Sequence, residues 1–226
     1  MSTFIPSHDQ QTFYDWMRYD HGSAILRAVA GSGKSTTIRQ AQILIPENQS
    51  VLLLSFNADI TRENKDKLAE IGNANGRQFA RTRVSTFHSI GFGAVCKHMN
   101  WNPRNVKTDG SKCLKIARNW LGPELFEIYG AYIAKLVGLA KGEGIGALVP
   151  DTEDRWYNLI NHHDLYLTVE EASEVEAVKL ARELLQRSNA AAKDEAFIDF
   201  NDQLYLVCLW KLRLWQNDWV FIDESA

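Results

Sequence analysis

The sequence lacks the features that mark secreted, zinc-binding and membrane-spanning proteins. It has three cysteines, which stand far apart and form no C-x-x-C pair. A disulfide framework or a zinc site built on paired cysteines is therefore excluded, and the pattern is typical of reduced, cytosolic proteins. The chain has no run of about 18 uncharged apolar residues, and its start lacks the charged and apolar regions of a signal peptide. We expect a soluble, cytoplasmic protein with no membrane partner.

The chain has no excess of positive charge either. Its 25 Lys and Arg residues are outnumbered by 28 Asp and Glu residues, so the formal net charge is −3. Any DNA-binding surface must therefore be local, because no basic field covers the protein. Hydrophobic residues make up 45% of the sequence and charged residues 23%, close to the values of average globular proteins. Such a chain should fold around a core as one or two domains.

Residues 28–35 have the sequence of a phosphate-binding loop. They read Ala-Val-Ala-Gly-Ser-Gly-Lys-Ser, with Ala28 where the usual G-x-x-x-x-G-K-[ST] pattern has glycine. An apolar run at 24–29 predicts a strand before the loop, and residues 37–44 predict a helix after it. The plain structural alternative is a Gly/Ser turn that happens to precede Lys-Ser. The order of strand, loop and helix favours a P-loop.

The chemistry of this loop suits a nucleoside triphosphate. Backbone N–H groups of residues 31–34 can surround a β-phosphate at the positive end of the helix. Lys34 can reach the β- and γ-phosphates and assist catalysis there, and the Ser35 hydroxyl can bind Mg²⁺. The residues that we expect to contact the nucleotide are Ala30, Gly31, Ser32, Gly33, Lys34, Ser35 and Thr36.

A second apolar run ends in acidic residues near the end of the sequence. Residues 219–222 predict a strand, and Asp223 and Glu224 follow it directly. We assign Asp223 to Mg²⁺ and Glu224 to the general base that activates the attacking water. Strands often end in acidic turns, so this feature is weak alone, but its pairing with a P-loop favours an ATPase site.

The order of predicted elements indicates an α/β fold with a helical insertion. Strands are predicted at 51–56 and 83–87, and the first is a continuous apolar run typical of a buried strand in a parallel sheet. Between residues 100 and 193 strand-like runs fade and amphipathic helices take over. We predict a P-loop NTPase core with a parallel sheet over 1–99 and 194–226, interrupted by an all-helical subdomain over 100–193. Helices are expected at 7–19, 60–71, 89–99, 112–120, 124–137, 152–161, 168–188 and 200–215, with capping boxes at Ser7 and Thr168 and an N-cap at Asp199.

The phosphate-binding loop resembles the first motif of superfamily 1 helicases of the UvrD/Rep type. Gln10, within Pro-Ser-His-Asp-Gln-Gln-Thr-Phe, resembles the glutamine of the family's Q motif, which reads the edge of adenine. Gln10 can instead close the capping box with Ser7, and Gln11 is a possible substitute in adenine recognition.

Two further segments resemble family motifs that contact single-stranded DNA. Residues 55–63 resemble T-F-T-N-K-A-A-x-E, which implies DNA contacts at Phe56 and Asn57, although Phe56 could equally be a core residue and Asp59 stands where the family often has lysine. Residues 85–91 resemble T-F-H-[GS]. The DNA contacts that this second motif implies are Thr86, Phe87 and His88, and a lone histidine would more often be structural.

Other residues have weaker functional interpretations. Residues 198–203 resemble the family's [DN]-F-x-D-[LM] stretch, although Asp199 could serve only as an N-cap. Three tryptophans of the helical insertion could stack on bases, but their apolar helical surroundings favour the core. His162-His163 lacks metal-ligand spacing and is expected on the surface. The tryptophans are Trp101, Trp120 and Trp156.

The resemblance implies an ATP-dependent DNA helicase with a RecA-like core, ATP and Mg²⁺ as cofactors, and a role in DNA repair or replication. Its partners would be single-stranded DNA or a duplex junction, with 3′ to 5′ polarity taken from the relatives. The sequence ends at Ala226, directly after the second motif, so we expect a piece that lacks the C-terminal helicase core and binds ATP better than it hydrolyses it. The alternatives are the helicase part of a recombination helicase-nuclease and a non-hydrolysing ATP- and DNA-binding regulatory module. A small-molecule P-loop kinase would leave the DNA motifs unexplained.

Overall fold

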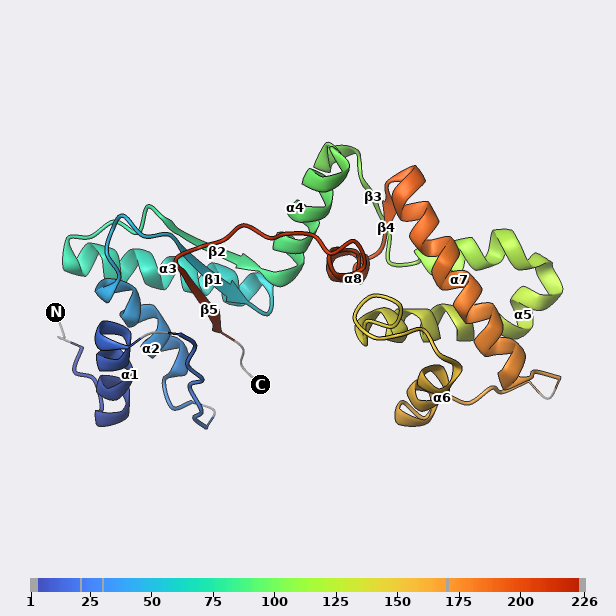
Figure 1. Cartoon of the computed structure of the whole chain (residues 1–226), viewed down its shortest axis with the longest axis horizontal. Coiled ribbons are helices and arrows are strands. Elements are labelled where there is room, and N and C mark those ends of the chain that lie inside the picture. Colours follow the sequence, from blue (N-terminus) through green and yellow to red (C-terminus); the bar gives the residue numbers. More distant parts are fainter. Residues whose placement is uncertain (1–3, 21, 30, 170, 224–226) are drawn as a thin grey trace. The chain divides into compact units, whose positions relative to one another are not determined.

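The computed structural model describes residues 4–20, 22–29, 31–169 and 171–223 (Figure 1). They form two compact units. Unit 1 comprises the residues up to 87 together with those from 215 onward, and unit 2 comprises residues 88–214. Unit 1 contains α1 (His8–Tyr19), α2 (Lys34–Ala41), β1 (Val51–Ser55), α3 (Ala58–Asn75), β2 (Thr82–Thr86) and β5 (Trp219–Asp223). Unit 2 is built from α4 (Phe87–Met99), β3 (Lys107–Thr108), α5 (Lys112–Gly142), α6 (Glu153–His162), α7 (Glu174–Glu195), β4 (Phe197–Ile198) and α8 (Asp202–Leu209).

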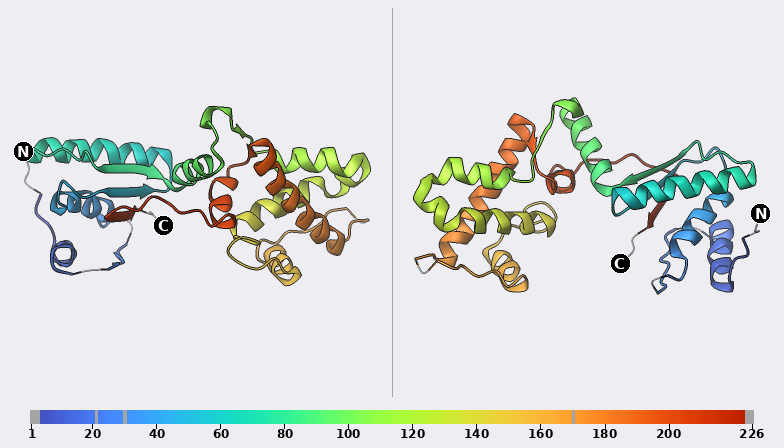
Figure 2. Two further views of the ribbon diagram at one scale, coloured as in Figure 1. Left: turned by 45° about the horizontal axis from the view of Figure 1, so that its top comes forward. Right: turned by 180° about the vertical axis from the view of Figure 1, so that it is seen from behind.

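Unit 1 is organised around a parallel sheet in the order β2-β1-β5. All five residues of β1 are buried, as the apolar run predicts. Helix α3 contacts β1 and β2 and runs alongside them in Figures 1 and 2, and α2 contacts β5. The core between helices and sheet contains Tyr14, Met17, Ile38, Val51, Leu53, Leu68 and Phe221. In the register of the sheet Ser55 lies between Thr86 and Asp223, so the carboxyl ends of the three strands meet at one edge.

The strand predicted at 24–29 is absent. These residues have no regular secondary structure, and Ile25 and Val29 are 81% and 78% exposed. The carbonyl of Ala28 accepts a hydrogen bond from Lys34 Nζ (2.7 Å), and the carbonyl of Val29 accepts one from the Ser32 N–H (3.3 Å). Both carbonyls therefore bond within the loop. Among the described strands β5 pairs with β1 alone, so residues 24–29 make no ladder with its outer edge.

Unit 2 is mainly helical, and α5 and α7 pack side by side (Figure 2). The two helices predicted at 112–120 and 124–137 are both present within α5, where the non-helical backbone of Gly122 (φ +74°), directly before Pro123, separates them. The core includes Ile133, Leu136, Trp156 and Leu184. Trp101 and Trp120 pack against this core as partly buried residues, which agrees with a core role, and His162 and His163 are exposed.

Two predicted helix starts in unit 2 are wrong. Helix α7 begins at Glu174 after Ser173, so Thr168 forms no capping box with Glu171. Helix α8 covers Asp202–Leu209 instead of 200–215 and has Asn201 as its N-cap residue. The carboxylate of Asp199 bonds the Asp202 N–H (2.9 Å), but it is also part of a buried ion-pair cluster, so capping is not its only role. The helix ends early because Lys211 adopts a left-handed conformation (φ +51°).

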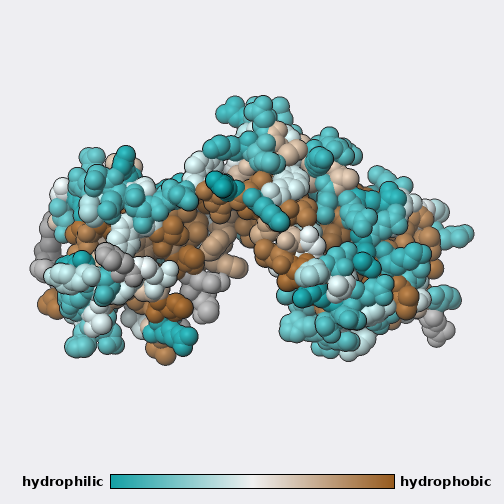
Figure 3. Space-filling model, in the orientation of Figure 1, coloured by the Kyte–Doolittle hydropathy of each residue, from teal (hydrophilic) through white to brown (hydrophobic). Residues whose placement is uncertain are grey.

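The surface of both units is mixed. Figure 3 shows hydrophobic patches in brown among hydrophilic residues in teal. Within the described ranges we find no helix that is both long and apolar enough to cross a bilayer.

Candidate nucleotide site and nucleic-acid interface

The phosphate-binding loop enters α2 through two glycines in the left-handed region. Gly31 has φ +77° and Gly33 has φ +86°, conformations that other residues adopt only with strain. Gly33 is the N-cap residue of α2, and among the described residues no side chain caps this helix start. The first N–H groups of α2 are thus available to an anion at the positive end of the helix. The predicted contact Ala30 lies outside the described residues.

The two predicted halves of the ATPase site come together in unit 1. Ser35 at the start of α2 donates its hydroxyl proton to Asp223 Oδ1 at the end of β5 (2.9 Å). The other oxygen, Oδ2, accepts a hydrogen bond from Asn64 Nδ2 of α3 (3.3 Å), which also bonds Ser55 Oγ. Asp223 is 6% exposed. A hydroxyl and a carboxylate at this distance are the hard oxygen ligands that suit Mg²⁺. Glu224 lies outside the described residues.

Gln10 closes the capping box considered for it and also contacts α2, while its role in adenine recognition stays a prediction. Its side chain closes a capping box with Ser7, whose N–H donates to Gln10 Oε1 (2.9 Å). Its Nε2 donates to Thr37 Oγ1 of α2 (2.9 Å), and Thr37 in turn donates to the Gly33 carbonyl (2.9 Å). Gln10 is therefore connected to the phosphate-binding loop through a single hydroxyl. The alternative residue Gln11 bonds Asp15 within α1 (2.8 Å).

Helix α2 is also connected to α3 by a link that the sequence did not reveal. Arg39 donates from Nε to the Ser35 carbonyl (3.0 Å) and forms an ion pair with Glu63 (3.0 Å). Glu63 is the acidic residue of the segment that resembles a DNA-contacting motif. The ion pair thus ties this segment to the helix that follows the phosphate-binding loop.

The predicted DNA contacts of unit 1 lie at the carboxyl end of the sheet. Phe56 follows β1 and is 63% exposed, which rules out a core role within this unit. Asn57 caps α3, since its Oδ1 accepts from the Ile60 N–H (2.9 Å). Thr86 ends β2 in register with Ser55, and Phe87 begins α4. The Phe56 ring is thus exposed to solvent, whereas the side-chain oxygen of Asn57 accepts the capping hydrogen bond of α3.

His88 stacks on an aromatic residue that the sequence analysis passed over. The rings of His88 and Phe200, both in unit 2, have centroids 3.7 Å apart and an interplanar angle of 20°. Phe200 is 57% exposed, and burial lowers the pKa of His88. A flat, partly exposed ring pair of this kind can stack on a nucleobase. The Asp-Phe-Asn-Asp stretch carries the sequence signal for this ring, since Phe200 stands between its acidic residues.

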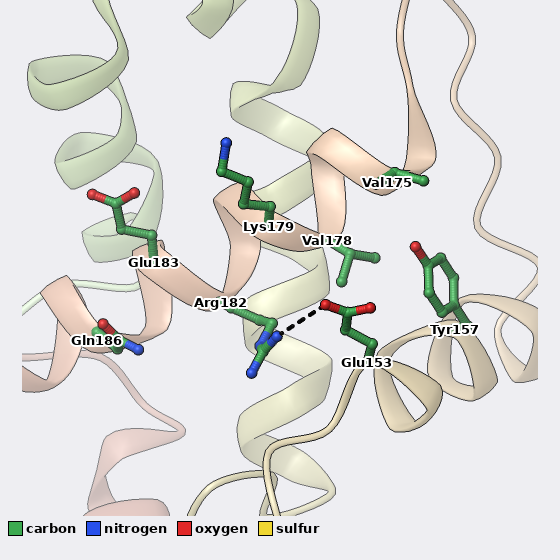
Figure 4. A pocket seen from close by; sticks show the side chains of 8 residues that line it. All are labelled: Glu153, Tyr157, Val175, Val178, Lys179, Arg182, Glu183 and Gln186. Atoms are coloured by element: carbon green, nitrogen blue, oxygen red, sulfur yellow. Dashed lines mark hydrogen bonds and ion pairs between the residues drawn. The ribbon is translucent and has the colours of Figure 1, made fainter.

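A separate surface pocket in unit 2 lies between α6 and α7 (Figure 4). Its volume is about 420 Å³, and Arg182 of α7 reaches Glu153 of α6 across it (3.5 Å). Its lining contains none of the predicted site residues. It mixes charged and apolar side chains, among them the exposed Val175 and the buried Val178.

The parallel sheet with its many surrounding helices is consistent with a RecA-like helicase domain. The family model of the UvrD/REP helicase N-terminal domain matches residues 11–223. The chain therefore belongs to the UvrD/REP helicase N-terminal domain family, and its function is that of a helicase-family protein that binds nucleotide and DNA. No curated protein matches the chain significantly.

Proposed function

We propose that this chain is the ATP- and single-stranded-DNA-binding part of an ATP-dependent DNA helicase of the UvrD/REP type, with 3′ to 5′ polarity. The observation that carries this proposal is the contact between Ser35 and Asp223. These residues are separated by 188 positions, yet their side-chain oxygens lie 2.9 Å apart at the start of α2 and the end of β5. This arrangement supports one site for phosphate and metal.

Each residue of the site has a distinct task in this proposal. The N–H groups at the start of α2 hold the phosphates, and Lys34 exchanges its bond to the Ala28 carbonyl for phosphate oxygens. Ser35 and Asp223 hold Mg²⁺, which when bound neutralises charge on the phosphate oxygens. Glu224 accepts the proton of the attacking water.

Adenine recognition by Gln10 remains compatible with its hydrogen bonds. The amide nitrogen uses one proton for Thr37, and the amide oxygen uses one acceptor position for Ser7. A glutamine amide has two donors and two acceptor positions, so one of each is left for the edge of a base. Its two present bonds hold the amide in place.

Single-stranded DNA would bind through stacking on exposed aromatic rings. Phe56 supplies such a ring in unit 1, and the His88–Phe200 pair supplies another in unit 2. Stacking on aromatic side chains tolerates any base sequence, which suits a motor that moves along DNA. A strongly basic surface is not required for this mode, in agreement with the formal net charge of −3.

Nucleotide binding is tested with a fluorescent ATP analogue in the presence of Mg²⁺. Lys34→Ala removes a charge-assisted bond worth about 1.5–3 kcal/mol, so we expect affinity to fall by about 10- to 150-fold. Lys67→Ala is the matched control, because Lys67 is an exposed lysine of α3 that pairs with Glu70. Equal affinity of both variants and the wild type would overturn the assignment of the loop.

DNA binding is tested separately by fluorescence anisotropy with a short labelled oligo(dT). We expect Phe200→Ala and Phe56→Ala each to weaken binding, since a base stacked on an aromatic ring contributes about 1–3 kcal/mol. Tyr166→Ala is the matched control, as Tyr166 is an exposed aromatic residue outside the segments that resemble DNA motifs. Tight oligo(dT) binding by both phenylalanine variants would remove this interface from the proposal.

A further inference from the structure

Four charged side chains are buried together in unit 2, next to the turn that carries Phe200. Lys112 and Lys141, from the two ends of α5, meet the carboxylates of Asp199 and Asp202. Lys112 Nζ lies 2.6 Å from Asp202 Oδ2. Lys141 Nζ lies 2.6 Å from Asp199 Oδ2 and 2.7 Å from Asp202 Oδ1. The Lys112, Lys141 and Asp202 side chains are 0% exposed, and that of Asp199 is 9% exposed.

The four charges of this cluster balance one another. Two ammonium and two carboxylate groups give no net charge, and α7 adds neutral acceptors, since Lys141 donates to Ser188 Oγ (2.9 Å) and Lys112 to the Ser188 carbonyl (2.7 Å). Burial acts to raise the pKa of Asp199, but the charge and hydrogen bond of Lys141, the Asp202 N–H and the charge of Lys112 together lower this pKa. Charged groups are rarely buried unless they are paired in this way. The cluster therefore fixes the relative positions of α5, α7 and the turn.

The cluster holds the turn on both sides of Phe200. Asp199 N–H donates to Asp202 Oδ2 (2.9 Å), and Asp202 N–H donates to Asp199 Oδ1 (2.9 Å). Asn201 Nδ2 donates to the Gly138 carbonyl of α5 (3.1 Å). Phe200 itself, with its neighbours anchored, projects toward solvent and stacks on His88.

We propose that Lys112 and Lys141 are positioning residues of the DNA interface, which anchor Asp199 and Asp202 so that the Phe200 ring stays stacked on His88. The proposal rests on the proposed function in that it gives the stacked pair a role in binding single-stranded DNA. The ring geometry itself can be measured without DNA.

The test uses a double variant that keeps the buried charges balanced. Lys141→Met with Asp199→Asn removes one charge of each sign and leaves the Lys112–Asp202 pair intact. The matched control is Arg182→Met with Asp151→Asn, which removes another ion pair of unit 2 (3.0 Å) away from Phe200. Arg182 is visible in Figure 4. Circular dichroism reports whether each variant is folded.

The first readout is the NMR spectrum of the His88 ring protons in the whole chain without DNA. In the wild type the stacked Phe200 ring shifts these protons upfield, and Phe200→Ala defines the position without stacking. We expect the cluster variant to move the His88 signals toward that position and the control to leave them in place. Unchanged signals in a folded cluster variant would overturn the proposal. If the cluster variant unfolds, Ser188→Ala replaces it, because this substitution keeps all four charges. We expect Ser188→Ala to shift the His88 signals in the same direction by a smaller amount. No shift would overturn the proposal.

The second readout is affinity for labelled oligo(dT) in a double-mutant cycle. We expect Phe200→Ala to weaken binding by about 5- to 150-fold and the cluster variant to weaken it by less. When Phe200 is already alanine, the cluster variant should cause no further loss, because its effect passes through that ring. Additive losses would overturn the positioning role. A wild-type chain that fails to bind oligo(dT) would refute the proposed function, and the NMR comparison would still decide whether the cluster holds the ring.

Discussion

Lys141→Met is expected to destabilise unit 2 strongly. The Lys141 side chain is fully buried and contacts both Asp199 and Asp202. Without Lys141, the two buried carboxylates have a single buried ammonium group, that of Lys112, to balance their charge. Removing one partner of a buried ion pair costs about 3–5 kcal/mol, because the remaining charge stays buried without compensation. That is a large part of the 5–15 kcal/mol that typically stabilises a folded protein.

Hydrogen exchange of backbone amides measures this loss within unit 2. A decrease of about 3–5 kcal/mol corresponds to protection factors about 150- to 5000-fold lower for the core amides of α5 and α7. The additional substitution Asp199→Asn should recover most of the lost protection, since the buried charges balance again. Arg182→Met is expected to have a small effect, because the Arg182–Asp151 pair is partly exposed. Protection in Lys141→Met within tenfold of the wild type would refute the energetic importance of the cluster.

Three further predictions concern unit 2. Gly91→Ala should lower the free energy of unfolding by about 1–3 kcal/mol in chemical denaturation, because its Cβ would clash with the Gln203 carbonyl oxygen. Gly142→Ala, whose Cβ meets nothing within 4 Å, should leave stability unchanged. Equal stability of the two variants would contradict the close packing of α4 on α8. The pKa of His88, measured by NMR titration, should lie below the usual histidine value of about 6.5, since burial favours the neutral ring. Phe200→Ala should raise this pKa. A wild-type pKa at or above 6.5 would contradict the burial of the ring. Folding lowers the pKa of Asp199, so its ionised carboxylate stabilises unit 2 above about pH 3.9, and this stabilisation is lost as the pH falls through the lower pKa of the folded state. Asp199→Asn should therefore make the stability of unit 2 less dependent on pH in the acidic range. An unchanged pH dependence would contradict this role of Asp199.

The sequence predicted the parts of the fold that depend on local pattern. Residues 51–55 of the run predicted at 51–56 form the fully buried β1, with Phe56 outside it, and Ser7 and Gln10 form the expected capping box. The run at 24–29 had the same apolar character but forms no strand, because a strand depends on a neighbouring ladder that a local pattern cannot reveal. The subdomain limits at 100 and 193 remain a prediction.

Candidate site residues could be predicted where a short local motif identifies them by residue type and spacing. The phosphate-binding loop and Asp223 were each predicted from a few residues. The structure places Ser35 next to Asp223, while their roles toward phosphate and metal stay predictions. The partnership of Lys112 and Lys141 with the acidic turn was not predictable, because these residues come from distant parts of the chain and follow no periodicity. Asp199 was interpreted as a helix cap, which the Asp-x-x-Asp spacing favours but which describes only part of its contacts.

The joint assignment of Ser35 and Asp223 to a metal site is tested by the Mg²⁺ dependence of ATP-analogue binding in the wild type and in Asp223→Asn. We expect Mg²⁺ to strengthen binding to the wild type and this gain to be largely lost in Asp223→Asn, while binding without metal stays similar. Ser35→Ala should reduce the same gain, since Ser35 and Asp223 form one oxygen site. A metal-dependent gain that is undiminished in both variants would contradict the assignment of these residues to the nucleotide site.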